Sequence, residues 1–452
     1  MNTSSFNEIQ MRSMKEESSK KNRYPSGLLY IIGNEAAERF SYYGVVAILQ
    51  VFLTEHLRNA DGQLAVLNEN DASMYTHYFK MGVYLMPIFG ALLADVFLGK
   101  YLTIMLLSLV YCFGHFCLSI NETLLGISVG LAFLSVGSGG IKSCTAAHVG
   151  DQFDESNQHL MGVVYDYFYM AINSGAALSM FLTPYLLSKY GSQVAFGVPG
   201  VFMVFATLLF FLGRNKFIAI PPVGMKVFFR DVANRTNLKA LGGITVLFFV
   251  FLPFFWALFD QMNSTWVTQM KRLDNSFELL GYSFNILPSQ LQAFNPVYIL
   301  LLAPLFTKYI YPLFNWTALQ KINIGFYLGA FTFVIIGLIE LALVNGYQPS
   351  FVFQAIACFL LTAAEVMVSI TVLEYAYRRS PKVTKSLVMG LFYLSIFLGN
   401  FIIVGVLKLV QSSVFAEVLL KGAGQFFFFA LLSCAAAILL RFFRSKSYLH
   451  DN

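Results

Sequence analysis

Charged residues are scarce in this chain. Only 12% of its 452 residues are Asp, Glu, Lys or Arg, whereas 57% are hydrophobic and the mean hydropathy is +0.64. A soluble domain carries about 25% charged residues and just under half apolar ones, so this composition excludes a soluble protein. Apolar runs of about 20 residues predict about twelve transmembrane helices. The expected fold class is an all-α, polytopic membrane protein.

Cysteine and histidine are also few. The five cysteines, Cys112, Cys117, Cys144, Cys358 and Cys434, fall in apolar stretches without metal-ligand spacing and are expected to be small core residues. The six histidines show no pair at i, i+4. We therefore expect no metal, no cofactor and no catalytic constellation. The net charge of +6 comes from basic connections on one side of a membrane and does not indicate nucleic-acid binding.

Basic residues gather in two connections. The segment from Arg214 to Lys239 holds six Lys or Arg against one Asp, and Arg378, Arg379, Lys382 and Lys385 crowd another connection. Positive residues favour the cytoplasmic side, so both connections are expected in the cytoplasm. The first lies at mid-chain and separates six expected spans from six, which is typical of a transporter built from repeats.

The domain organisation follows from these spans. We expect them at 27–54, 74–97, 101–121, 123–147, 160–187, 193–213, 242–268, 289–310, 321–344, 350–377, 385–409 and 421–443. The domains are then a cytoplasmic tail at 1–26, a six-helix bundle at 27–213, a cytoplasmic linker at 214–240, a second six-helix bundle at 241–443 and a cytoplasmic tail at 444–452. The tail has no apolar stretch and is no cleavable signal, so we expect a multi-pass protein of the plasma (inner) membrane.

Three charges fall within five residues of the first span. Glu35, Glu38, Arg39 and Tyr42 recur at i, i+3, i+4 and i+7, so one helix face collects two carboxylates, a guanidinium and a phenol. A charge at bilayer depth costs about 2.5 to 3.5 kcal/mol, so this face should line protein or water. One Arg neutralises one Glu and leaves the other free to titrate. A structural ion pair between helices is the alternative.

Further polar side chains fall inside apolar stretches. His77 and Lys80 lie one turn apart near a predicted helix start. Either both are solvated residues at the end of that helix, or His77 is a titratable group in the transport pathway. Lys142 follows the small residues 137–140, which allow close helix crossing, and should reach a cavity. Glu365 and Glu374 are separated by about 900° of helical rotation, so at most one should line a cavity, and we expect Glu374.

Two more spans carry polar residues at helical spacing, and a third has an amide beside a proline. The first two sets are Asp166, Tyr169 and Asn173, and Trp256, Asp260 and Asn263. Asn295 precedes Pro296, which removes a backbone hydrogen bond and should open the helix locally.

Charges of opposite sign are expected to meet in one cavity. Arg39 and Lys142 in the first half suit a carboxylate, whereas Glu374 and Asp260 in the second half suit an ammonium, so a zwitterion would fit between them. Aromatic rings on the same polar stripes would accept varied apolar side chains. These rings are Tyr42, Tyr43, Tyr169 and Trp256.

Two motifs resemble signatures of the proton-dependent oligopeptide transporter family. Residues 35–43 (Glu-Ala-Ala-Glu-Arg-Phe-Ser-Tyr-Tyr) resemble its first-helix Glu-x-x-Glu-Arg signature, and residues 168–175 (Phe-Tyr-Met-Ala-Ile-Asn-Ser-Gly) are similar to its fifth-helix motif. The surroundings of Lys142, Trp256, Asn295 and Glu374 resemble its fourth, seventh, eighth and tenth helices. The turn 90–100 resembles the loop signature of the major facilitator superfamily.

The resemblance implies a major facilitator fold with twelve helices in two six-helix bundles. It also implies import of di- and tripeptides by alternating access, driven by a proton gradient in a lipid bilayer, by a protein expected to act as a monomer. By position, the peptide carboxylate would be held by Arg39 and Lys142, and the amino end by Asn173, Asn295 and Glu374. Proton coupling would involve Glu35, Glu38 and Arg39, with His77 and Asp260 at positions linked to protonation or gating.

The chain departs from the family pattern at two places, and two alternatives stay open. Val46 stands where many peptide-carrying members have a further arginine, and the linker 214–240 has no room for two extra helices. The missing arginine leaves open a cargo of nitrate, another small anion or an amino acid. A polytopic membrane enzyme is the remote alternative, because the chain shows no nucleophile elbow.

Overall fold

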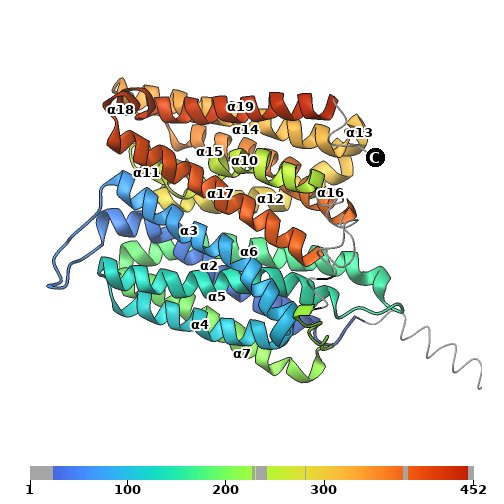
Figure 1. Ribbon diagram of the computed structural model, residues 1–452. Coiled ribbons are helices and arrows are strands. Elements are labelled where there is room, and N and C mark those ends of the chain that lie inside the picture. The colour runs from blue at the N-terminus through green and yellow to red at the C-terminus, as the bar shows by residue number, and fades with distance from the viewer. Residues whose placement is uncertain (1–23, 227–229, 231–241, 280, 380–384, 446–452) are drawn as a thin grey trace, which may run out of the picture.

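The computed structural model describes residues 24–226, 230, 242–279, 281–379 and 385–445, and nearly all of them lie in long helices packed side by side (Figure 1). Parts of the predicted tails and linker lie outside the described residues, namely 1–23, 227–229, 231–240 and 446–452.

The part of the first half that the structure describes forms six long helices. They are α2 (Leu28–Glu55), α3 (Glu69–Leu92) with its continuation η1 (Leu93–Leu98), α4 (Lys100–Ile120), α5 (Leu124–Gly150), α6 (Met161–Tyr190) and α7 (Ser192–Leu212). Short 3₁₀ turns lie at η2 (Gln158–Leu160) and η3 (Arg214–Lys216). Side chains that accept backbone N–H groups fix two of the starts, because Asn68 caps α3 and Thr123 caps α5.

The second half contains more interrupted helices. Its first span runs through η4 (Leu247–Phe251), α10 (Leu252–Phe259), η5 (Asp260–Asn263) and α11 (Thr265–Met270), and its second through η6 (Pro288–Ala293), α12 (Phe294–Leu305), η7 (Phe306–Ile310) and α13 (Tyr311–Phe314). The others are α14 (Ala318–Val344), the run α15 (Phe351–Glu365), η8 (Val366–Ile370) and α16 (Thr371–Arg379), then α17 (Lys385–Ser412), the short α18 (Val414–Leu420) and α19 (Ala423–Ser445).

The prediction of an all-helical polytopic protein is confirmed. Within the described residues, 11 helical segments are long and apolar enough to cross a membrane. The twelfth, α2, is 28 residues long and carries the buried charges of the first span, which lower its hydropathy. One small element was not expected: β1 (Ser276–Leu279) pairs antiparallel with β2 (Tyr282–Asn285) in the connection after α11.

The helices form two groups, one from each half of the chain, drawn blue to green and yellow to red in Figure 1. Among the described residues, one large apolar core fills the first group, and two large clusters and one small one lie in the second. The groups meet where α3 lies beside α17 and α6 beside α12. We call the end with the connections 56–68 and 271–287 the outer end, following the charge distribution.

The small residues 137–140 do allow a close helix crossing, as the sequence predicts. A Cβ placed on Gly90 of α3 would lie 2.0 Å from the carbonyl oxygen of Gly140 on α5. Two backbones approach this closely only where neither carries a side chain. The crossing fixes α3 against α5 and so positions the polar residues of both helices.

Candidate transport site

Arg39 is held between two carboxylates of its own helix. Its Nε lies 2.7 Å from Glu35 Oε1 and 3.2 Å from Glu38 Oε2, and Ser138 on α5 donates to Glu38 Oε1 at 2.9 Å. The three charged side chains are buried, with Arg39 the most exposed at 8%. The face therefore meets protein and not lipid. One guanidinium opposite two carboxylates leaves room for a further cation or a proton.

Lys142 lies near this cluster without joining it. Its Nζ sits 3.9 Å from the centre of the Tyr42 ring, and the residue is 4% exposed. A cation over a ring face is stabilised by the ring quadrupole. Within the described residues Lys142 forms no ion pair, so its ammonium is the cation best placed to meet either glutamate or a substrate carboxylate.

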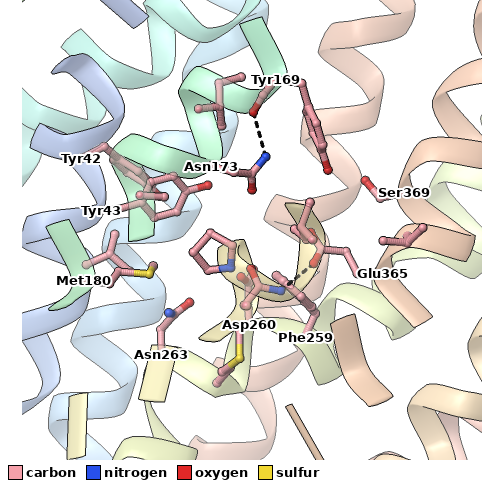
Figure 2. Close-up of a pocket in the computed structure, with 18 of the residues that line it drawn as sticks. Tyr42, Tyr43, Tyr169, Asn173, Met180, Phe259, Asp260, Asn263, Glu365 and Ser369 are labelled. Carbon is pink, nitrogen blue, oxygen red and sulfur yellow. Dashed lines mark hydrogen bonds between the residues drawn. The ribbon is translucent and has the colours of Figure 1, made fainter. Parts of the chain in front are cut away.

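A cavity of about 190 Å³ lies between the two groups of helices. Figure 2 shows Tyr42, Tyr43 and Asn173 on one side and Glu365 and Ser369 on the other. The predicted site residues that line it are Tyr42, Tyr43, Tyr169, Asn173, Asp260 and Asn295. Its wall combines aromatic rings with a few polar groups, which is typical of a ligand pocket.

The sequence-based choice between the two glutamates of the tenth span was wrong. Glu365 lines the cavity and accepts a hydrogen bond from Asn295 Nδ2 at 2.8 Å. Glu374 lies outside it and forms a solvent-exposed ion pair with Arg378, with 51% of its side chain exposed. At most one of the two lines the cavity, as predicted, and the segment between them is not a straight α-helix because it includes the π-helical turn η8. Glu365 lies on α15, which packs against α12.

Trp256 is also placed differently from its predicted role. It lies in the apolar core of the second half, in contact with the rings of Phe255, Phe259 and Phe392. A Cβ on Gly399 would lie 2.6 Å from Trp256 Cβ, so α10 and α17 cross tightly here. The indole therefore packs between helices and does not line the cavity in this structure.

The outer floor of the cavity is a chain of hydrogen bonds that crosses between the halves. Lys80 on α3 donates to Asp260 Oδ1 at 2.6 Å and to Asn263 Oδ1. Asn400 on α17 donates to Asp260 Oδ2 at 2.5 Å, and its Oδ1 accepts from His77 Nδ1 at 2.7 Å. We call His77, Asn400, Asp260, Lys80, Asn263 and Gln292 the cross-half belt.

The cross-half belt joins α2 and α3 to three elements of the second half. Asn263 donates to Gln292 Oε1 at 2.5 Å, and Gln292 donates to the carbonyl of Ala47 on α2 at 3.2 Å. His77 Nε2 lies 2.8 Å from Ser264 Oγ. Further outward, Lys271 Nζ pairs with Glu55 at 2.5 Å. These links join the two halves at the outer end.

Sequence reasoning left the Lys80 position open and passed over Glu365. A start signal for α3 is present at Asn68, whose side chain accepts the N–H of Asp71. The helix thus begins at Glu69, upstream of the span expected at 74–97, and Lys80 is not at a wet helix end. It is 3% exposed.

Comparison with known proteins identifies the family. A protein-family model described as the POT family matches residues 101–237 and 225–421. The chain belongs to the POT family. Peptide transporter family 1 of Drosophila melanogaster is 37% identical over 362 residues, which cover 69% of this chain and 47% of that protein. Solute carrier family 15 member 2 of Mus musculus is 32% identical over 418 residues, or 80% of this chain and 55% of that protein.

Solved structures of the POT family share the fold. The crystal structure of the transporter PepTSo has a TM-score of 0.83 and 31% identity, covering 94% of this chain and 99% of that one. The crystal structure of another proton-dependent oligopeptide (POT) family transporter has a TM-score of 0.77 and 33% sequence identity, and it covers 91% of this chain and 99% of that one. The chain spans about half the length of the curated relatives it matches. It is a multi-pass membrane protein of a transporter family, not of an enzyme family.

Proposed function

We propose that this chain is a proton-coupled symporter that imports di- and tripeptides by alternating access. The main support is the cavity between the two halves, where the buried carboxylate of Asp260 and the buried ammonium of Lys80 face one ligand. Relatives named as peptide transporters support the substrate class. The protein would act as a monomer in the plasma membrane, with both termini and the basic connections in the cytoplasm.

The bundles at 27–213 and 241–443 would rock about the cavity while the linker 214–240 joins them. The outer end is closed by the cross-half belt, so the described state would face inward. Asn173, Asn295 and Glu365, in place of Glu374, would hold the amino end of the peptide. The rings of Tyr42, Tyr43 and Tyr169 would accept variable side chains.

Proton coupling would depend on competition for cations near α2. Protonation of Glu35 or Glu38 would release Arg39 to act with Lys142 on the substrate carboxylate, and loss of that proton to the cytoplasm would restore the internal Arg39 pair. The burial of Arg39 between both carboxylates supports this scheme, because a guanidinium already paired is unavailable to a ligand. A change of protonation at His77 or Asp260 would alter the cross-half belt at the outer end, because Asn400 is hydrogen-bonded to both residues.

An anion as cargo is disfavoured by the charges of the cavity. Asp260 and Glu365 line it with Lys80, so within the described lining two carboxylates stand against one ammonium. A nitrate ion would meet a net negative wall, whereas a zwitterion would present its ammonium to the excess carboxylate.

Uptake of labelled dialanine into proteoliposomes tests the proposal, with and without an imposed pH gradient and membrane potential. We expect the wild-type protein to accumulate dialanine only with the gradient. Glu38→Gln should abolish accumulation and keep counterflow exchange, whereas Glu278→Gln, on the exposed hairpin, is the matched control. Gradient-driven accumulation by Glu38→Gln would refute the coupling scheme. Equal uptake of nitrate and dialanine would refute the substrate class.

A further inference from the structure

One buried cation of the cavity has no role in the motifs that identify the family. Lys80 is 3% exposed, and it is the only Lys or Arg in the cavity lining within the described residues. Val46 lines the same cavity and contributes no charge. Arg39 and Lys142, the cations expected to hold a carboxylate, do not line it in this structure. A ligand in the cavity therefore meets the Lys80 ammonium first.

The neighbours of Lys80 leave one of its hydrogen-bond donors available. An ammonium has three N–H groups, and the acceptors among the described residues are Asp260 Oδ1 and Asn263 Oδ1. Asp260 is fixed from its other oxygen by Asn400 at 2.5 Å, and Asn263 by Gln292 at 2.5 Å. Because both acceptors are held in place, the lysine chain is oriented and its third donor is preorganised for a ligand.

The cavity charges also require a carboxylate to be placed near Lys80. The lining carries Lys80 against Asp260 and Glu365, and these two acids come from different elements, η5 and α15. Glu365 is bonded to Asn295 and has no cationic partner within the described residues. A zwitterion that puts its ammonium on Glu365 must direct its carboxylate away from that wall, and Lys80 is the lining group of opposite charge.

We propose that Lys80 is a substrate-binding residue that recognises the carboxylate of a zwitterionic ligand and thereby sets the preference for a free carboxyl terminus. This inference rests on the proposed function for the identity of the ligand as a peptide. Asp260 binds the same ammonium through another donor, and its negative charge repels the ligand carboxylate and weakens its binding. The two residues thus act in opposite directions on one measurable quantity, the preference for a free acid over its amide.

The test compares dialanine with dialanine amide, which keeps the ammonium and lacks the carboxylate. The ratio of their apparent affinities is measured by competition for labelled uptake and by thermal stabilisation of the purified protein. A charge-assisted hydrogen bond predicts that Lys80→Met lowers the acid-over-amide ratio about ten-fold or more. Lys80→Arg should retain the ratio, and Asp260→Asn should raise it. Lys408→Met, an exposed lysine on α17, is the matched control and should leave the ratio unchanged.

Each outcome decides the question. If the wild-type protein imports dialanine and Lys80→Met keeps the wild-type ratio, the inference is wrong while the proposed function stands. If Lys80→Met does not fold, Asp260→Asn decides, because an unchanged or lower ratio there also overturns the inference. A wild-type protein that neither binds nor imports dialanine refutes the proposed function and the inference together.

Discussion

Replacing Glu365 by Gln tests whether this carboxylate holds the amino end of the substrate. Glu365 lines the cavity and accepts from Asn295 at 2.8 Å, while Asn295 also donates to Thr362 at 3.1 Å. Glutamine has the same shape and keeps an oxygen for Asn295. The substitution therefore removes a negative charge with little change in geometry.

The expected effect follows from the loss of charge on one hydrogen bond. A bond to a charged group contributes about 1.5 to 3 kcal/mol, and one between neutral groups about 0.5 to 1.5 kcal/mol. The difference of about 1 to 1.5 kcal/mol corresponds to an apparent KM for dialanine that rises about 5- to 13-fold. Competition by N-acetyl-dialanine, which has no ammonium, should change much less.

Glu374→Gln is the control that separates the structure from the sequence-based choice. Glu374 pairs with Arg378 on the exposed side of α16, where such pairs contribute about 0 to 1 kcal/mol. We expect its KM for dialanine to equal the wild-type value. If Glu374→Gln raises KM and Glu365→Gln does not, the assignment of the cavity carboxylate is refuted.

Two further predictions concern packing and pH. Gly90→Ala should lower the melting temperature of the detergent-solubilised protein, because its Cβ would lie 2.0 Å from an α5 carbonyl oxygen and overpacking costs about 1 to 3 kcal/mol. Gly405→Ala, whose Cβ meets nothing within 4 Å, should melt like wild type, and equal melting of both variants would contradict the crossing. In the outer connection, the Ser276 hydroxyl and backbone N–H hold the pKa of Asp274 below its ordinary value of 3.8. This stabilisation is complete above about pH 4 and is lost as pH falls through the lowered pKa, so Asp274→Asn should speed hydrogen exchange of the hairpin at neutral pH but not in strong acid.

Most of the fold could be predicted because the bilayer imposes one length on every span. Apolar runs of about 20 residues mark the helices whatever their tertiary neighbours. The hairpin at 276–285 escaped prediction because two strands of four residues in a polar connection carry too little periodicity to stand out. The break before Asn295 also lies earlier than Pro296 predicts, at the 3₁₀ turn η6.

The site was less predictable because it depends on helix phase and depth. A straight helix separates the faces of Glu365 and Glu374 but does not say which face meets the cavity, and that choice depends on packing against α12. The depth of Lys80 depends on where α3 begins. The helix starts at Glu69 instead of residue 74, so at a rise of about 1.5 Å per residue Lys80 lies about 16 Å from its start. Lys80 is therefore a residue of the cavity and not a solvated residue at the helix end.

Under the alternating access proposed above, the two charged networks would respond differently. Glu35, Glu38 and Arg39 belong to one helix, so their pairing survives any rigid-body motion of the halves. The Lys80–Asp260 pair joins α3 to η5 and must break when the outer end opens. A proton on the α2 cluster can therefore change which cations a substrate meets, but it cannot by itself open the outer end. Opening needs a compensating partner for Lys80 and Asp260, and a zwitterion in the cavity supplies a carboxylate for the first of them.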